Sequence, residues 1–361
     1  MWTPQAHFER IGRDMFFDQY GIVPSAAPAS PSLDTTSPKT QQKVTAGTGC
    51  RVLHYCGTAH QKVHWPSHKR VCKAIKTSTE KVWMAMADIK RGLDAAGGDV
   101  RSYFASNPPE AEAHVHFRYI SGRNLTKAGT KASFEEGLQN FLEVDKLCAN
   151  KPEINDTAGD FIPGLYLRLG REKECLAFLK NKCKGNLGDI YHRWSDRATP
   201  RPRANAEALS LAHAAMLCVF KLRILQDLND LDEADQALGN KLPAELFNEC
   251  RSYLIGEATK TDANIIRSID KREDLRSEID IVELDLRDLR AYIDALDANY
   301  FDAIANPDKH RKMQPAYEPE LPITEALAQT YDAWAETPGA FTLFQQICAR
   351  PTYTAGDEDV G

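Results

Sequence analysis

The sequence lacks any apolar run approaching the roughly 20 residues that a membrane-spanning helix needs. Its 361 residues are 42% apolar, with a mean hydropathy of −0.46. It also lacks the catalytic motifs whose mechanism is known: a glycine-rich phosphate loop ending in Gly-Lys-Ser/Thr, HExxH and GxSxG. We therefore expect a protein with a real core, no membrane contact and no enzymatic activity.

Cysteine is scarce and scattered. Nine cysteines in 361 residues are too few for a disulfide framework. Six of them lie in helical patterns, mostly among apolar neighbours, and we expect free, buried thiols there: Cys148, Cys175, Cys183, Cys218, Cys250 and Cys348. The N-terminal residues have no apolar core of a signal peptide. Both features favour an intracellular protein, in the cytoplasm or the nucleus, and the sequence does not decide between the two.

Strand patterns are also missing, because no segment alternates apolar and polar residues over a sustained length. The predicted fold class is all-α, with an irregular helical-hairpin, solenoid-like array that has no faithful repeat. The predicted domains are a short helix with a disordered linker at 1–48, a small zinc finger at 49–73, the helical domain at 78–350 and a disordered tail at 351–361.

Two helical hairpins are predicted in the body. Apolar periodicity on both sides of Gly170 predicts antiparallel helices at 156–170 and 171–183. A second pair, at 323–334 and 339–349, is separated by a turn that contains Pro338.

Carboxylates recur on one helical segment near residue 285. Asp280 with Glu283, and Asp285 with Asp288, form two acidic pairs three residues apart. A di-metal site would need Glu-x-x-His motifs on partner helices, and the sequence has none. We expect a solvated, ion-paired surface instead.

Two histidines, His114 and His116, alternate in a short AHVHF segment. On a strand they would share a face and could be ligands. The surrounding pattern is helical, so we expect both to be surface groups.

One stretch stands apart, residues 50–73, which holds three cysteines and four histidines and no acidic residue. Residues 50–76 carry six positive charges: Arg51, Lys62, Lys69, Arg70, Lys73 and Lys76. The simpler interpretation is the solvated face of a zinc module; the alternative is a contact with an acidic partner or nucleic acid.

The spacing of these donors suits a metal ion. Residues four apart on a helix share a face, so Cys56 with His60 and His68 with Cys72 could complete one Cys2His2 zinc site. Three further donors stand nearby: Cys50, His54 and His64.

The order of residues resembles the second half of the MYND zinc finger, typically written YC-x3-CQ-x3-W-x2-HK-x2-C. The matching residues are Tyr55-Cys56, His60-Gln61, Trp65-Pro66, His68-Lys69 and Cys72, and Cys50 fits the cysteine that precedes them. Histidine replaces cysteine at position 60, which zinc tolerates. The first three cysteines of the family have no counterpart, and Gly47 stands in the place of the third.

The resemblance implies two interleaved zinc sites. Cys56 and His60 would be the remaining ligands of one site. Cys50, His68 and Cys72 would be the remaining ligands of the other, completed by water or by His54. The three-ligand site is the one expected to hold zinc.

The resemblance also implies a protein partner, and possible peptide-binding residues are Gln61 and Trp65. In this family the region around the tryptophan helps to form a shallow surface that receives proline-containing peptides. Alternatively, Trp65 is a core aromatic that covers the metal.

The helical body resembles fungal proteins in which a MYND finger accompanies an α-helical region, through residues 161–171, 174–179 and 335–340. Some MYND fingers belong to SET-type lysine methyltransferases, but the β-rich pattern and the Asn-His-Ser-Cys-like motif are absent. A nucleic-acid-associated regulator is the other alternative, although no base-reading helix accompanies the basic residues. We therefore expect a non-catalytic interaction module or scaffold.

Overall fold

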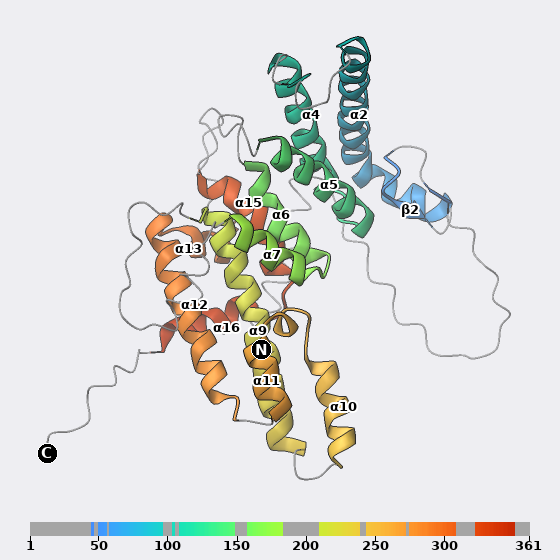
Figure 1. Cartoon of the computed structure of the whole chain (residues 1–361). Helices are drawn as coiled ribbons and strands as arrows, with labels where there is room; N and C mark the ends of the chain where they lie inside the picture. Colours follow the sequence, from blue (N-terminus) through green and yellow to red (C-terminus); the bar gives the residue numbers. More distant parts are fainter. Residues whose placement is uncertain are drawn as a thin grey trace, which may run out of the picture. The chain divides into compact units, whose positions relative to one another are not determined.

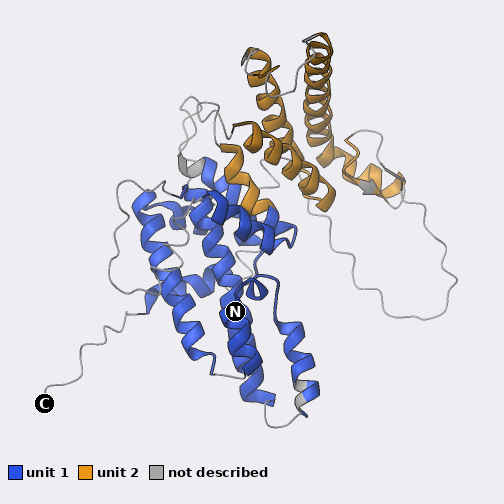
Figure 2. Ribbon diagram, in the orientation of Figure 1, with its two compact units in different colours: residues 1–8, 166–361 blue, residues 9–165 orange. Residues whose placement is uncertain are grey.

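The structure is a computed structural model of the whole chain (Figure 1). It describes residues 45–46, 50–55, 58–96, 103–104, 108–148, 157–182, 209–238, 243–271, 274–307 and 322–350. The chain forms two compact units, unit 2 at residues 9–165 and unit 1 mainly at 166–361 (Figure 2). The predicted segment 351–361 lies outside the described residues, as does the segment 1–48 except for 45–46.

Unit 2 is built from three helices and a small hairpin. Its elements are β1 (Thr45–Ala46), β2 (His54–Tyr55), α2 (Thr58–Ala96), α4 (Pro108–Thr126) and α5 (Lys131–Cys148). The two strands pair antiparallel, with Thr45 opposite Tyr55. In sequence order α2 packs against α4, and α4 against α5, so the three helices form a consecutive series (Figure 1).

Helix α2 is longer than the sequence pattern indicated. A helix was expected to resume only near Ser78, but α2 runs without a break from Thr58 and contains Pro66. Proline removes one backbone donor without ending the helix here. The interval between the predicted finger at 49–73 and the predicted helical domain at 78–350 therefore lies inside one helix, and no linker separates them.

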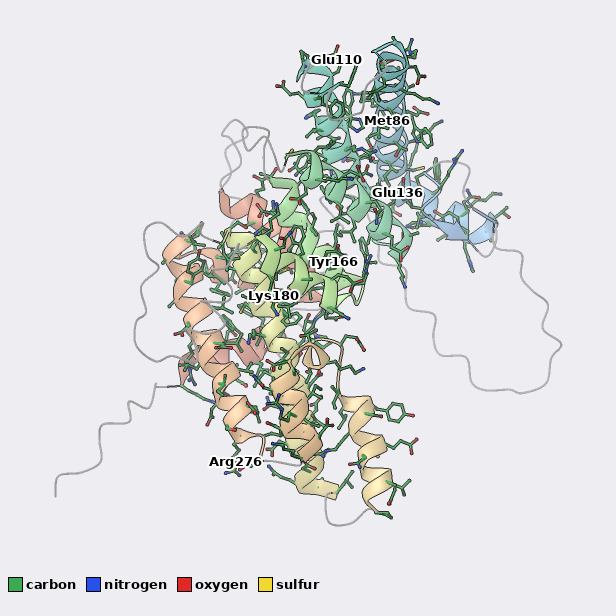
Figure 3. All side chains as sticks on the ribbon, viewed as in Figure 1. Met86, Glu110, Glu136, Tyr166, Lys180 and Arg276 are labelled. Atoms are coloured by element: carbon green, nitrogen blue, oxygen red, sulfur yellow. The ribbon has the colours of Figure 1, made fainter. Side chains whose placement is uncertain are left out.

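Side chains fill the space between α2 and α4, as Figure 3 shows along the helices that carry Met86 and Glu110. Near the end of α2, Ile89 packs with Phe104 and Ala111 in one buried cluster. At Gly92 a Cβ atom would meet the ring of Tyr103, so a larger residue there would require that ring to shift. The pairing of the two helices thus depends on local shape as well as on apolar burial.

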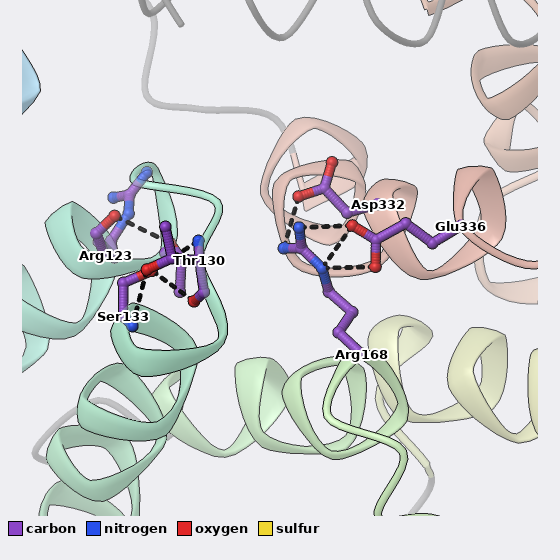
Figure 4. Close-up of polar contacts among 7 residues, drawn as sticks. Arg123, Thr130, Ser133, Arg168, Asp332 and Glu336 are labelled. Carbon is purple, nitrogen blue, oxygen red and sulfur yellow. Dashed lines mark hydrogen bonds and ion pairs between the residues drawn. The ribbon is translucent and has the colours of Figure 1, made fainter. Parts of the chain in front are cut away.

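Two hydroxyl residues fix the start of α5 (Figure 4). The backbone N–H of Ser133 donates to Thr130 Oγ1, and the backbone N–H of Thr130 donates to Ser133 Oγ, each at 3.1 Å. This reciprocal pair satisfies two donors, in the manner of a capping box.

Unit 1 contains most of the helices. Helix α6 (Thr157–Arg168) contains the boundary between the two units in the sequence. The described elements that follow it are α7 (Glu172–Lys182), α9 (Leu211–Leu238), α10 (Ala244–Leu254), the 3-10 turn η1 (Thr259–Thr261), α11 (Ala263–Lys271), α12 (Arg276–Leu296), α13 (Tyr300–Ala305), α15 (Pro322–Ala335) and α16 (Ala340–Ala349). The all-α prediction is confirmed, apart from the two-residue strands of the hairpin. A solenoid-like repeat stays a prediction.

Helix α9 is the centre of unit 1. It contacts α7, α10, η1, α12, α15 and α16. Residues 212–222 of α9 are buried on every side, because helices cover this helix all round. The sequence of such a helix is apolar on nearly every side, so it lacks the polar face of an amphipathic helix.

The helices and the turns of both predicted hairpins lie at the expected residues, whereas their antiparallel packing stays a prediction. Helices α6 and α7 are joined at Gly170, and α15 and α16 at Gly339, with φ angles of +67° and +71°. Glycine reaches this left-handed region without the steric cost that other residues meet. Gly170 and Gly339 therefore occupy these turns because the turns require a positive φ angle.

The acidic helix α12 is only in part the solvated, ion-paired surface that was expected, because Asp280 is exposed but Glu283 and Asp285 are buried. Asp285 is 4% exposed and accepts a hydrogen bond of 2.7 Å from Lys221 Nζ, which is equally buried. Glu283 is also buried and pairs with Arg287 and Arg350. The expectation failed at these two residues because α9 packs directly over this side of α12, which the spacing of carboxylates does not reveal.

His114 is a second correction. It lies on a helix as expected, but it is 2% exposed, whereas His116 is exposed. The Nε atom of Arg118 donates to His114 Nε2 at 2.9 Å. Burial and the charge of Arg118 lower the pKa of His114 to about 4. His114 is therefore a neutral core group, which the alternating AHVHF pattern did not indicate.

The predicted thiols form no disulfide where the structure describes them, and Cys148, Cys175 and Cys218 are buried as expected. Cys250 is exposed and Cys348 is half-buried, so the expectation of burial is wrong for Cys250 and only partly met at Cys348. Cys183 lies outside the described residues. Among the helices that the structure describes, none is long and apolar enough to cross a membrane.

Candidate metal centre

Three predicted ligands come together at the start of α2. Cys50 lies in the loop before β2, while His68 and Cys72 lie one turn apart on α2. Their donor atoms all lie within 4.8 Å of one another, and Cys50 Sγ is 3.2 Å from His68 Nε2. Within the described ranges this is the one group of three or more such donors that could hold a metal ion.

The donor set fits zinc. Bond lengths of about 2.3 Å to sulfur and about 2.0 Å to nitrogen place the ligands of a tetrahedral zinc ion about 3.6–3.8 Å apart. The observed separations, 3.2 Å for Cys50 Sγ and His68 Nε2 and at most 4.8 Å for the other pairs, lie on both sides of this range. Two thiols and one imidazole are also the soft and borderline ligands that zinc prefers.

Neighbouring aromatic groups hold His68 in place. The ring of His64 stacks on that of His68, with centroids 5.4 Å apart and planes 18° from parallel. His64 Nδ1 shares a hydrogen bond of 2.9 Å with the hydroxyl of Tyr55 on β2. The hairpin and the helix are thus linked beside the ligands, and His64 supports a ligand within the described cluster instead of joining it.

Burial controls the protonation of the ligands. It lowers the pKa of His68 to about 4, helped by the nearby His64, so the ring is neutral near pH 7. Burial also raises the pKa of Cys72, and the neighbouring Cys50 raises it further. Two adjacent thiols resist forming two thiolates unless a cation compensates the charge.

The loop that carries Cys50 is fixed to the body of unit 2. Val52 packs with Val71, Ile75 and Leu125 in a buried cluster against which Cys50 lies. The hydroxyl of Thr130 donates to the carbonyl of Val52 at 3.0 Å. The ligand loop therefore rests on the turn between α4 and α5, and sequence spacing gave no signal of this contact across 78 residues.

Of the other predicted ligands, His60 is the one whose side chain the structure describes, and it is not in the described cluster. His60 lies on the first turn of α2 and is exposed. Cys56 lies outside the described residues, and of His54 only its backbone in β2 is described. The described geometry brings Cys50, His68 and Cys72 together. The arrangement inferred from spacing alone, which pairs Cys56 and His60 with His68 and Cys72, stays a prediction.

The predicted peptide-binding residues share one side of α2. Gln61 and Trp65 are four residues apart, so they project from neighbouring turns. Trp65 is 42% exposed, and its neighbour Val63 is 81% exposed. Trp65 is therefore not a core aromatic that covers the metal.

The basic residues of the finger all face solvent. Arg51, Lys62, Lys69, Arg70, Lys73 and Lys76 are exposed. Of these, Lys76 pairs with Glu80 at 3.9 Å, which at this exposure contributes little stability.

Comparison with known proteins agrees with the geometry of this site. No solved structure matches the chain. The resemblance of the helical body to fungal proteins stays a prediction. Residues 38–72 match the family model of the MYND finger, and the chain therefore carries a MYND-type zinc-finger region in front of an all-α body.

Proposed function

We propose that this protein is a non-catalytic interaction protein whose finger binds one zinc ion and presents a peptide-binding surface. The convergence of Cys50, His68 and Cys72 within 4.8 Å carries this proposal. A MYND match ending at Cys72 supports it independently.

The role of zinc follows from where the three ligands lie. One is in the loop and two are on α2, so a bound ion would clamp the loop onto the helix. The same loop carries Val52, which packs on Leu125 of α4. Metal binding would therefore stabilise the start of unit 2, and water or His54 is proposed as the fourth ligand.

The test is the zinc content of purified full-length protein, measured by inductively coupled plasma mass spectrometry. We expect about one zinc ion per chain and its loss in Cys50→Ser and in Cys72→Ser. Cys250→Ser is the matched control, because Cys250 is a free, exposed thiol on α10. Absence of zinc in the unaltered protein would refute the metal site.

A further variant distinguishes the two ligand arrangements. If Cys56→Ser retains zinc while Cys50→Ser loses it, the set described above is correct. The opposite pattern would support the arrangement of Cys56, His60, His68 and Cys72. Two zinc ions per chain would mean that both interleaved sites are filled.

The proposed partner is a short, proline-containing peptide of another protein. The exposed ring of Trp65 offers an apolar contact, and the amide of Gln61, one turn away on the same side of α2, offers a hydrogen-bonding group. This is the composition expected of a shallow peptide site.

Peptide binding is tested by titrating proline-containing peptides and comparing Trp65→Ala with Trp83→Ala. Trp83 is a suitable control because it is also exposed, at 72%, and lies on the same helix 18 residues later. We expect at least a tenfold loss of affinity in Trp65→Ala and little change in Trp83→Ala. Equal effects of the two changes would contradict the assignment.

Nucleic-acid binding is the second candidate, and the exposure of all six basic residues favours it. A phosphate-driven complex should weaken steeply between low and physiological salt. Affinity for a mixed-sequence duplex, measured at 50 mM and 200 mM salt, separates it from peptide binding, which should depend less on salt.

A further inference from the structure

Helix α2 is an end helix of unit 2. Its main contacts are with α4, and it also touches the strand β2 (Figure 1). Most residues on the side of α2 that faces away from these contacts are exposed. A helix in this position normally carries polar and charged residues on its outer side. Helix α2 follows this rule in its first half and departs from it in its second half.

The exposed side of α2 contains one straight row of residues. They recur at alternate intervals of four and three residues, a spacing that keeps them on one side of a helix. The row extends over about 27 Å, at a rise of 1.5 Å per residue. We call it the outer stripe, and its residues are Lys69, Lys73, Lys76, Glu80, Trp83 and Ala87, with Met84 beside Trp83.

The basic part of the outer stripe is not neutralised within the described chain. Lys69 and Lys73 form no ion pair with any residue that the structure describes. Lys76 pairs with Glu80 at 3.9 Å, and both side chains are well exposed. A pair of this kind is weak, because both charges stay hydrated. Three lysines on consecutive turns are therefore available to an anionic partner.

The apolar part of the outer stripe begins two turns further along the helix. Trp83 is 72% exposed and Met84 is 67% exposed, although both lie inside a regular helix. The exposed Ala87 continues the same side one turn later. Contact between water and neighbouring large apolar side chains is unfavourable, and such patches are typical of interaction sites. The stripe thus combines a cationic part and an apolar part along one line.

We propose that the outer stripe binds an acidic, amphipathic helix of a partner protein. The carboxylates of this helix would contact Lys69 and Lys73, and its large apolar residues would cover Trp83 and Met84. Two helices pack side by side along rows of this spacing, with about 8–10 Å between their axes. This surface uses none of the zinc ligands and none of the residues of the proposed peptide site, so it goes beyond the proposed function.

A nucleic acid and a membrane suit the outer stripe less well. A phosphate backbone would contact the lysines but would leave Met84 and Ala87 in water. A helix that lies in a membrane surface carries apolar residues along its whole length, with basic residues beside them. In the outer stripe the basic and apolar residues instead follow one another along the helix, so only one end could enter the lipid.

The test is titration of full-length protein with fluorescent probe helices of about 20 residues, whose length of ~30 Å covers the stripe. One half of each probe carries glutamates and the other half carries leucine and phenylalanine, and two versions place the acidic half first or last. A peptide of the same composition in scrambled order is the matched control. Fluorescence anisotropy should show micromolar affinity for one version, at least tenfold weaker binding of the scrambled peptide, and a loss of affinity as salt rises.

Two variants of the protein test the two parts of the stripe. Lys73→Glu and Trp83→Ala should each weaken probe binding at least tenfold. The controls are Lys131→Glu, at an exposed lysine of α5, and Val63→Ala, at an exposed position of α2 outside the stripe, and both should bind the probe unchanged. Since Trp83→Ala is expected to leave proline-containing peptides bound, this variant also separates the outer stripe from the proposed peptide site. Circular dichroism verifies that each variant is folded.

Failure of both probe versions to bind at millimolar concentration would overturn the proposal. The same holds if the scrambled peptide binds equally well, or if Lys73→Glu and Trp83→Ala bind the probe as the unaltered protein does. Tighter binding of phosphatidylcholine–phosphatidylserine vesicles or of a mixed-sequence DNA duplex would assign the stripe to another class of partner and overturn it as well. So would self-association that Trp83→Ala abolishes, measured by sedimentation, because the occupant would then be a second copy of this chain.

Discussion

The two longest described helices, α2 and α9, are built in opposite ways. Helix α9 is covered on all sides, so its residues from 212 to 222 are buried. Helix α2 has one covered side, and it exposes large apolar residues elsewhere: Val63, Trp65, Trp83, Met84 and Met86. Since burial is the main source of stability, side chains on α9 serve the fold, whereas the exposed ones on α2 are free to serve recognition.

The comparison extends to the polar groups of the two units. In unit 1, Lys221 and Asp285 form an ion pair in which both side chains are almost fully buried. In the candidate metal centre of unit 2, the donors of the half-buried Cys50 and of the buried His68 and Cys72 lie close together. In the Lys221–Asp285 pair, the attraction between the two charges offsets the cost of burying them. The three donors of the candidate metal centre instead need a bound cation to reach their full stability.

The largest effect is expected from breaking the pair in unit 1. Lys221→Met leaves Asp285 buried without its cation, which should lower the free energy of unfolding by about 3–5 kcal/mol. Urea denaturation followed by circular dichroism measures this. The double change Lys221→Met with Asp285→Leu should recover most of the loss, and a single change that costs under about 1 kcal/mol would contradict the pair's role.

A smaller effect is expected on acidification of unit 2. His114 has a pKa of about 4 in the folded protein, below the value of about 6.5 in an unfolded chain. The unfolded state therefore binds more protons between these values, and the free energy of unfolding falls as pH drops from about 6.5 to about 4, by at most ~3 kcal/mol.

The pH series is repeated with His114→Gln and, as a control, with His116→Gln on the exposed side of the same helix. The glutamine at 114 can still accept from Arg118 but does not titrate, so the slope in this range should flatten. The control should keep the slope; a flat profile in the unaltered protein would refute the prediction.

The smallest effect is expected on the exposed side of α2. Val63→Ala should change the free energy of unfolding by less than about 0.5 kcal/mol, because Val63 is 81% exposed and alanine favours the helix. Leu225→Ala on α9, where the side chain is fully buried, should cost about 2–5 kcal/mol in the same assay. Similar costs at the two positions would remove the contrast between these helices.

Sequence reasoning was most successful where the structure depends on local patterns. The turns at Gly170 and Gly339 follow from apolar periodicity and from residues that tolerate positive φ angles. The ligand set of Cys50, His68 and Cys72 was implied by family resemblance, whereas spacing alone also allowed Cys56 and His60. The continuity of α2 through Pro66 was missed because proline normally signals the end of a helix.

Contacts between distant segments were beyond the sequence. The Lys221–Asp285 pair joins residues 64 positions apart, and the Thr130–Val52 hydrogen bond joins residues 78 positions apart. The lining of one cavity in unit 1 likewise combines residues of α7, α9 and two turns. The sequence pattern around a lysine or aspartate on a helix is the same whether or not another helix covers that residue, so it does not predict which charges are buried.

By itself, then, the sequence determined the all-α class, the position of the turns and the kind of metal that the finger would take, because helix periodicity, glycine conformation and ligand chemistry are local properties. The tertiary structure alone decided which donors share one site, which charges are buried and where a cavity opens. Those features depend on which helices pack against one another, and the packing buries Asp285 and His114 while it leaves Trp65 in solvent.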